Sequence, residues 1–165
     1  PIKEDYYFGL ATERLFLPVI KTMCPQIVDW FFIPEGVFHN CLVIAVKKPF
    51  PGAVRATANF VWGNGQLMNS KMIIFVDENI NPSDTSCVLW KVFNNIDATR
   101  DIFFYEGSLD VLDHSSKVPC YGSKIYIDAT AKNPDENNGR IWPDEAKSNE
   151  DIIKHVNENR EKYGL

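Results

Sequence analysis

Apolar and polar residues follow two different periods along this chain, and their succession predicts an α/β fold. Short β-branched or aromatic runs bounded by proline, glycine or polar residues predict strands. These runs are IVDWFFIP (27–34), NCLVIAVKK (40–48), MIIFV (72–76), DIFFYEG (101–107) and SKIYIDAT (123–130). The run 72–76 is apolar throughout, which is typical of a strand covered on both faces.

Apolar residues at helical spacing predict helices before and between these strands. The first helical pattern covers 16–23, where Pro18 predicts a kink or the start of a helix. The second covers 52–62. The third begins with Asn81 as the expected N-cap, a proline after it, and Asp84 in the first turn. Its single apolar stripe consists of Val88, Leu89, Val92, Phe93 and Ile96.

The middle of the chain therefore alternates strand, helix, strand, helix, strand, which predicts parallel strands joined by right-handed crossovers. We expect an α/β fold: a three-layer domain with a mixed, largely parallel sheet flanked by helices, and residues 1–165 as one domain. Residues 132–148 are rich in Asn, Pro, Asp and Glu and predict an exposed loop. Ser148 and Asp151 indicate a capping box that opens a polar terminal helix over 149–162.

Composition narrows the function classes. The 165 residues are 45% hydrophobic and carry a net charge of −5 without a cluster of lysine or arginine, which argues against a nucleic-acid partner. No apolar run approaches the roughly 20 residues that span a bilayer. The four cysteines form no CxxC pair and indicate free thiols in a reducing compartment. The chain starts without methionine, as a piece of a longer protein would.

The stretch SLDVLDHSSK (108–117) contains the residue types of a hydrolytic site. Asp113, His114 and Ser115 are adjacent, however, and neighbouring side chains on an extended chain point in opposite directions. They are therefore poorly placed for a Ser–His–Asp relay, and the strained G-x-S-x-G turn of such enzymes is missing. We interpret this stretch as a loop whose polar side chains bind local backbone groups.

Other candidate sites are weaker. His39, His114 and His155 are far apart and lack the spacing of a metal site. Asp77 and Glu78 follow a strand at the end where open α/β sheets bind ligands, so either acid–base work or capping of the next helix is open to them.

Glycine and aromatic residues add little chemistry. The glycines of WGNGQ (62–66) are weak evidence for a phosphate site, and GSK (122–124) fits a phosphate contact or a strand-initiating turn equally well. Four strand phenylalanines are predicted to lie in the core rather than around a cofactor. They are Phe31, Phe32, Phe103 and Phe104.

Five motifs occur in one linear order: ATERLFLPVI (11–20), PQIVDWFFIPEG (25–36), VDENI (76–80), VLWKVFNNIDATRD (88–101) and YGSKIYIDATAK (121–132). This series resembles the carboxy-terminal part of the UbiD family, the 3-polyprenyl-4-hydroxybenzoate carboxy-lyases and related decarboxylases. The likeness runs from about residue 6 to residue 132 and then loosely to the end. The combination of VLW, the D-x-x-RD of 97–101, and GSK followed by IDAT is the specific part.

The resemblance implies a decarboxylase (lyase) of aromatic or unsaturated acids, of the ubiquinone- or menaquinone-precursor type. Such enzymes use prenylated FMN held with manganese and potassium, and the flavin carries the difficult chemistry. The family's Glu–Arg–Glu network and metal ligands come from an amino-terminal domain that this chain does not match. The chain alone is therefore expected to be inactive and to hold neither flavin nor metal.

The partners implied are that missing amino-terminal flavin-binding domain, further copies in a homo-oligomer, and an aromatic acid substrate. The resemblance also implies a cytoplasmic protein, with membrane association through a lipophilic substrate as an open variant. The terminal helix is either an arm that reaches a second subunit or a solvated end.

The resemblance also assigns positions. Asp110, Val111 and Leu112 fall where the family's loop reaches the substrate pocket, and Met68 falls at another position lining it. Where some relatives place a lysine against the flavin phosphate, this sequence has Asn64. Two alternatives stay open: a non-catalytic interaction or oligomerisation module, and an independent enzyme that uses Asp77, Glu78 or Asp113 as a general base.

Overall fold

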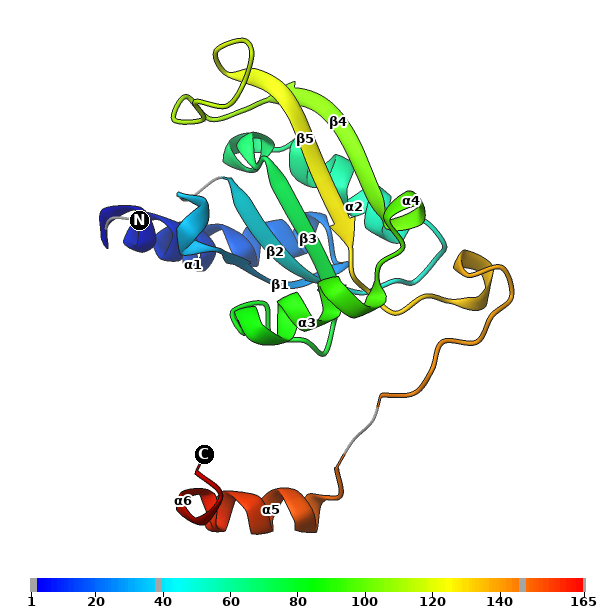
Figure 1. Ribbon diagram of the computed structural model, residues 1–165. Helices are drawn as coiled ribbons and strands as arrows, with labels where there is room; N and C mark the ends of the chain where they lie inside the picture. The colour runs from blue at the N-terminus through cyan, green and yellow to red at the C-terminus, as the bar shows by residue number, and fades with distance from the viewer. Residues whose placement is uncertain (1–2, 38–39, 146–147, 165) are drawn as a thin grey trace. The chain divides into compact units, whose positions relative to one another are not determined.

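The computed structural model describes residues 3–37, 40–145 and 148–164, so His39 lies outside the described residues. The chain separates into two compact units, Pro1–Lys132 and Asn133–Leu165, and each is described by itself. The assignment of 1–165 to a single domain stays a prediction. The elements of the first unit (Figure 1) are α1 (Lys3–Met23), β1 (Ile27–Phe32), η1 (Pro34–Gly36), β2 (Cys41–Val46), α2 (Ala53–Trp62), η2 (Gly65–Asn69), β3 (Met72–Asp77), α3 (Thr85–Asn95), α4 (Ala98–Asp101), β4 (Ile102–Ser108) and β5 (Tyr121–Asp128).

The strands form one mixed sheet in the order β1-β2-β3-β5-β4. The central strands β2, β3 and β5 are parallel, whereas the edge strands β1 and β4 are antiparallel to their neighbours. The predicted α/β class, with a mixed sheet flanked by helices, is confirmed. The strand–helix–strand unit from β2 through α2 to β3 is parallel, as predicted.

The direction predicted for β4 is wrong. β5 occupies the place beside β3, and β4 pairs antiparallel with β5 from Ile102 opposite Ile127 to Ser108 opposite Tyr121. β4 and β5 therefore form a long hairpin. Because Met72 of β3 pairs with Ile125, the first residues of β5 project past the start of β3.

Two apolar clusters lie on opposite faces of the sheet and create the three layers. On one face, α1 and α2 contribute Ile20, Val54 and Val61 to a cluster with Ile44 and Phe75. On the other face, α3 contributes residues that pack against Val43, Ala45 and Val76. Both faces of the central strands are covered, as the continuous run 72–76 predicted.

The observed helices correct two local predictions. α1 begins at Lys3 and runs through Pro18, so no helix starts at that proline. α3 begins at Thr85 because Asp84 is its N-cap and accepts from the Cys87 N–H at 3.0 Å. Asn81 instead accepts from the N–H of the second residue after it, which forms a local turn.

The apolar stripe and the strand phenylalanines are only partly buried. Val88 and Val92 lie in the core, whereas Phe93 is 75% exposed. Of the phenylalanines, Phe32 is buried and two others are half-buried, but Phe104 is 80% exposed, so its core assignment is wrong. The reason is that successive side chains of the edge strand β4 point to opposite faces of the sheet. Phe103 stacks on Tyr126, and Phe104 points to the other face.

The second unit contains η3 (Pro134–Glu136), α5 (Glu150–Glu158) and α6 (Arg160–Tyr163). The expected capping box at Ser148 is wrong, because Asn149 is the N-cap of α5 and accepts from the Asp151 N–H at 2.9 Å. Among the described residues, no helix combines the length and apolar character needed to cross a bilayer.

The cap of α3 gives a direct test of the corrected helix start. Asp84→Ala should lower the free energy of unfolding by about 1 kcal/mol, because the Cys87 N–H loses its acceptor. Chemical denaturation would measure the change. Ser86→Ala, an exposed substitution in the same turn, is the control and should have little effect. Equal effects of the two substitutions would contradict the cap.

Candidate functional site

The loop between β4 and β5, residues 109–120, lies where the parallel strands begin. It leads directly into β5 and projects from the upper end of the sheet (Figure 1). η2, which carries Met68, immediately precedes β3 and so lies at the same end. The structure therefore brings Met68 and the loop that contains Asp110, Val111 and Leu112 to one end of the sheet.

An ion pair fastens this loop to the start of β3. The Lys71 Nζ lies 2.9 Å from the Asp113 Oδ2, and the Asp113 side chain is only 3% exposed. Ser115 donates to the other Asp113 oxygen through its N–H at 2.9 Å and its hydroxyl at 2.7 Å. Burial raises the pKa of Asp113, but the hydrogen bonds from Lys71 and Ser115 outweigh it and leave that pKa below its ordinary value.

These contacts explain the polar residues that resembled a hydrolytic site. The Ser115 hydroxyl donates to Asp113 directly, whereas His114 is exposed. Asp110 accepts from the Leu112 N–H at 2.8 Å and so shapes the turn. The interpretation of this stretch as a loop held by local hydrogen bonds is confirmed.

Three of the four side chains expected to wall a pocket are apolar and accessible. Met68 is 40% exposed, Val111 73% and Leu112 56%. Leu109 is buried at the base of the loop, and a Cβ at Gly122 would stand 3.0 Å from its side chain. The loop thus presents apolar side chains on a base that packs closely. Whether Asp110, Val111, Leu112 and Met68 contact a substrate stays a prediction.

A buried lysine supports the Met68 turn. Lys124 of β5 is 2% exposed, and its ammonium donates to the Met68 carbonyl and lies 5.3 Å from the Trp62 ring. The Trp62 ring stacks on Tyr105 with centroids 5.2 Å apart, and its N–H donates to the Ser70 carbonyl. Burial lowers the pKa of Lys124 to about 8.

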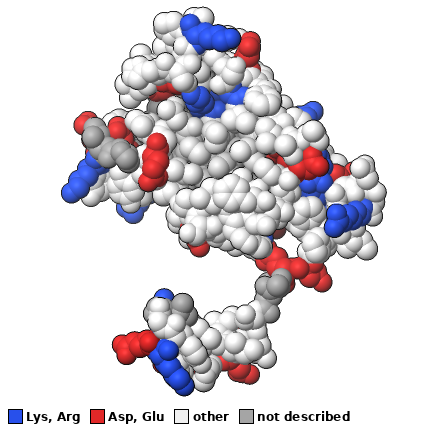
Figure 2. Space-filling model, in the orientation of Figure 1, with Lys and Arg blue, Asp and Glu red and all other residues white. Residues whose placement is uncertain are grey.

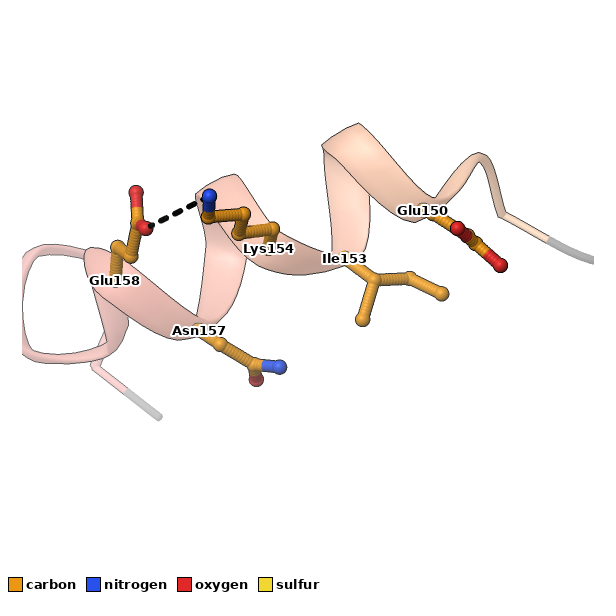
Figure 3. Close-up of a pocket in the computed structure, with 5 residues that line it drawn as sticks. All are labelled: Glu150, Ile153, Lys154, Asn157 and Glu158. Carbon is orange, nitrogen blue, oxygen red and sulfur yellow. Dashed lines mark ion pairs between the residues drawn. The ribbon is translucent and has the colours of Figure 1, made fainter.

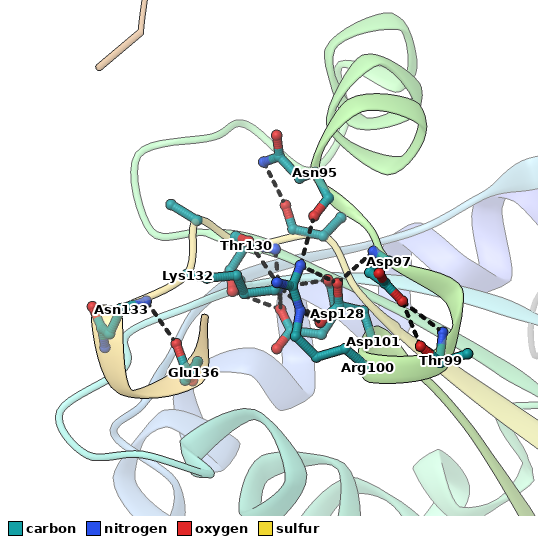
Figure 4. A network of polar contacts seen from close by, with 12 residues as sticks. Asn95, Asp97, Thr99, Arg100, Asp101, Asp128, Thr130, Lys132, Asn133 and Glu136 are labelled. Carbon is teal, nitrogen blue, oxygen red and sulfur yellow. Dashed lines mark hydrogen bonds and ion pairs between the residues drawn. The ribbon is translucent and has the colours of Figure 1, made fainter. Parts of the chain in front are cut away.

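The opposite end of the sheet is closed by a buried charge network, shown in Figure 4. The Lys132 Nζ lies 2.9 Å from the Asp128 Oδ1 and 3.4 Å from the Asp101 Oδ1, and the Lys132 side chain is 1% exposed. Arg100 donates two hydrogen bonds to the same Asp101 carboxylate, from Nε to Oδ1 at 2.9 Å and from Nη2 to Oδ2 at 2.7 Å. Thr130 donates to Asp128 through both its N–H and its hydroxyl.

The segment after β5 is fastened across the ends of the neighbouring strands. Asp77 accepts from the Ala131 N–H at 3.0 Å, and Lys48 donates to the Ala131 carbonyl. Burial raises the pKa of Asp77, against the opposing effects of that N–H and of Lys48. Glu78 is exposed and lies 3.7 Å from Lys47. Asp77 thus holds the backbone at Ala131. This role differs from both predicted alternatives, acid–base work and capping of the next helix.

Two hollows among the described residues are small or open. One of about 150 Å³ lies between α1 and η2, lined by Thr12, Phe16, Ile20, Asn64, Gly65, Gln66 and Leu67. This volume is below the roughly 300 Å³ of ordinary ligand sites. The second follows one face of α5 in the other unit (Figure 3), where Lys154 and Glu158 pair at 4.0 Å and both side chains are exposed.

The charged surface and the acidic side chains offer no obvious ion site. On the face in Figure 2, acidic and basic side chains are scattered rather than gathered into one band. Within residues 3–37, 40–145 and 148–164, no three His, Cys, Asp or Glu side chains come together as a metal site requires.

Asn64, the position expected to face a flavin phosphate, is poorly suited to that contact. The Asn64 amide donates to the Phe60 carbonyl at the end of α2. It is therefore engaged within its own segment and carries no charge to offer a phosphate. The cofactor contact expected at Asn64 stays a prediction.

Comparison with known proteins identifies the family. The family described as 3-octaprenyl-4-hydroxybenzoate carboxy-lyase C-terminal domain (UbiD_C) matches residues 6–129. The chain belongs to this UbiD carboxy-terminal domain family. Curated relatives include an uncharacterized protein of Aquifex aeolicus, 38% identical over all of this chain and 34% of that protein, and one of Archaeoglobus fulgidus, 41% identical over 87% of this chain and 30% of that protein.

Solved structures of UbiD-class enzymes share the fold. The enzyme HmfF from Pelotomaculum thermopropionicum, in complex with FMN, is 25% identical with a TM-score of 0.72, over 93% of this chain and 34% of that one. The closed form of Sedimentibacter hydroxybenzoicus vanillic acid decarboxylase has a TM-score of 0.78 at 24% identity, over 93% of this chain and 33% of that chain. The chain thus spans about a third of the length of these relatives.

In this UbiD-type domain, two of the motifs that signalled the family supply the charge network. D-x-x-RD supplies Asp97, Arg100 and Asp101, and IDATAK supplies Asp128 and Lys132. Their role in the structure is to join the start of β4 to the end of β5. Sequence reasoning missed the buried lysines; the available signal was a lysine at an inward position of an alternating strand, as at Lys124.

The network predicts that substitutions of two lysines, Lys132 and Lys154, have very different effects on the free energy of unfolding. Lys132→Met should lower the free energy of unfolding by about 3–5 kcal/mol, because the buried Asp101 and Asp128 carboxylates would both lose the Lys132 ammonium and only Asp101 would keep another cation, Arg100. Lys154→Met removes an exposed pair and should change it by less than about 0.5 kcal/mol. Denaturant titration at pH 7 compares them, and similar losses would contradict the role of Lys132.

The buried Lys124 predicts a pH-dependent difference in stability. Its pKa is about 8 in the folded protein, against about 10.4 when unfolded. Between these values the unfolded chain binds more protons, so the wild type gains stability as pH rises, whereas Lys124→Met lacks this term. The stability of wild type relative to Lys124→Met should therefore rise by about 2 kcal/mol from pH 8 to 10.

Denaturation of both proteins at a series of pH values measures this difference. The contributions of the other titrating groups to stability cancel, because both proteins share them. Lys117→Met, at an exposed loop lysine, should show no such trend. A difference for Lys124→Met that is flat with pH would contradict the burial of a charged amine at this position.

Proposed function

We propose that this chain is the carboxy-terminal domain of a prenylated-FMN-dependent decarboxylase acting on aromatic or α,β-unsaturated carboxylic acids. Membership of the UbiD family and the likeness to HmfF, whose structure holds FMN, support this. A related dimeric HmfF structure holds prenylated FMN. The observation that carries the proposal is the set of accessible apolar side chains, Met68, Val111 and Leu112, on turns fixed to one end of the sheet.

The proposed contribution of this chain is a wall of the substrate pocket. Apolar side chains at Met68, Val111 and Leu112 would contact the ring or double bond of the acid and exclude water from one side. When bound, the flavin supplies the bond chemistry of decarboxylation. The flavin, manganese and potassium would be held by an amino-terminal domain of the longer protein, together with its acid–base residues.

We also propose contacts with further copies of the chain. α5 exposes Ile152 (57%) and Ile153 (48%) on a helix whose other residues, apart from Val156, are polar, which suits a contact with a second subunit. The substrate within the class of aromatic and unsaturated acids, including ubiquinone and menaquinone precursors, is left open by the residues described.

A non-catalytic interaction module is the second candidate, and one observation favours it. The end of the sheet beyond Val76, where α/β domains bind ligands, is filled by Asp77 and the segment 129–132. An independent enzyme has no such support: Asp77 and Asp113 lie at opposite ends of the sheet, and each carboxylate is held by hydrogen bonds.

Reconstitution of the longer protein tests the proposal. With prenylated FMN, manganese and potassium, it should decarboxylate members of a panel of aromatic and unsaturated acids that includes vanillic acid, measured as released carbon dioxide. Leu112→Asp should lower kcat/KM by at least about 30-fold, because a charge replaces part of the apolar wall. Phe93→Asp, at an exposed apolar position on α3, is the matched control and should stay within about twofold.

Three results would contradict the proposal. They are failure to release carbon dioxide from any acid of the panel, an unchanged kcat/KM in Leu112→Asp, and stoichiometric flavin absorbance bound to the 165-residue chain alone. The first would favour the interaction module. The last would show that this chain holds the cofactor itself.

A further inference from the structure

The turn that presents Met68 has little support of its own. η2 is a five-residue 3-10 helix whose N-cap residue, Asn64, makes no side-chain cap, and Gly65 adopts a positive φ of 46°. Short 3-10 helices have poorer hydrogen-bond geometry than α-helices, and their terminal carbonyls need other donors. The carbonyl of Met68 lies near the end of this helix and receives its donor from outside it.

That donor is the ammonium of Lys124. The Lys124 side chain lies on the same face of β5 as Tyr126, toward α2, and Tyr105 of β4 pairs directly opposite it. A buried ammonium is costly unless it is hydrogen-bonded. Donation to the Met68 carbonyl and the nearby Trp62 ring are the interactions that compensate its burial.

A second lysine fastens the facing element. Lys71 begins the segment that continues from η2 into β3 and pairs with Asp113 of the loop 109–120. The two parts of the proposed wall, the Met68 turn and the 109–120 loop, are thus each tied to a strand through a lysine side chain. Of these two lysines, only Lys124 binds a backbone carbonyl, whereas Lys71 binds a side chain.

We propose that Lys124 is a positioning residue of the substrate pocket, which holds the Met68 carbonyl and so fixes the turn 65–69 and the direction of the Met68 side chain. This inference rests on the proposed function, because it assigns Lys124 to the same pocket. Lys124 itself is too buried to touch a substrate, so it acts through Met68.

The first experiment examines the turn in the 165-residue chain by NMR. The chain has three methionines, so the ¹³C-methyl signal of Met68 is readily assigned, and Met23 serves as an internal reference. In Lys124→Met, the Met68 methyl signal should move, and the Ser70 amide, which donates to Leu67, should exchange about tenfold faster relative to Ile74. Lys124→Arg should restore both, and Lys117→Met should change neither.

Unchanged Met68 and Ser70 signals in Lys124→Met would overturn the proposal. If Lys124→Met does not fold, a measurement on the wild type still tests the proposal. The ¹⁵N-labelled ammonium of Lys124 should be protected from exchange with water, unlike that of the exposed Lys117. Equal exchange rates at the two ammonium groups would also contradict the hydrogen bond from Lys124 to the Met68 carbonyl.

The second experiment uses the longer, reconstituted protein and the best substrate of the acid panel. Lys124→Met should raise KM about fivefold with kcat within about twofold, and Lys124→Arg should recover most of the loss. An unchanged KM in a variant whose Met68 signal has moved would overturn the link to the pocket. If no acid is turned over, the proposed function fails, whereas the NMR result still decides whether Lys124 fixes the turn.

Discussion

The neutralisation of the buried Lys132 ammonium is the constraint on which much of this fold depends. Its partners Asp101 and Asp128 stand at the start of β4 and at the end of β5, next to the Ile102–Ile127 pair. Unpaired charges cannot be buried at a tolerable cost, so these two chain positions must meet at Lys132. Their meeting sets the register of the β4–β5 hairpin and sends its connecting loop to the other end of the sheet.

This arrangement gives the two ends of the sheet different roles. At the carboxyl ends of β3 and β5, Asp77, Lys48 and Asn95 hold the backbone of residues 129–131, so charged and polar side chains fill the usual ligand position. At the amino ends, apolar side chains lie exposed on turns that lysines fasten. The proposed pocket would lie at the second end, because its apolar side chains are accessible and lysine contacts fasten the turns that carry them.

Much of the fold could be predicted from the sequence because strands and helices leave local patterns. The apolar run 72–76 identified a strand covered on both faces, and the spacing over 52–62 identified α2. The direction of β4 could not be predicted, because periodicity indicates that a strand exists but not which strand lies beside it. Asp84 replaced Asn81 as the cap for a similar reason: both residues suit either a cap or a turn, and the choice depends on packing of α3 against the sheet.

The candidate site was less predictable than the fold. Sequence reasoning correctly interpreted Asp113 and Ser115 as loop residues, because their local hydrogen bonds follow from adjacency. Lys124 was missed because its partner Met68 is 56 residues away, and Lys132 because Asp101, one of its two carboxylate partners, is about 31 residues away; only the folded chain brings these groups together. Two of the motifs that indicated the family, D-x-x-RD and IDATAK, form a network in this structure that fixes β4 against β5.

A crystal structure of the longer protein with flavin and an aromatic acid bound tests the central claim most directly, since it shows which end of the sheet faces the substrate. The account predicts that the acid lies in contact with the Met68 and Leu112 side chains, with Asp77 and Lys132 buried away from it. An acid bound at the carboxyl ends of β3 and β5, beside Asp77, would contradict the account.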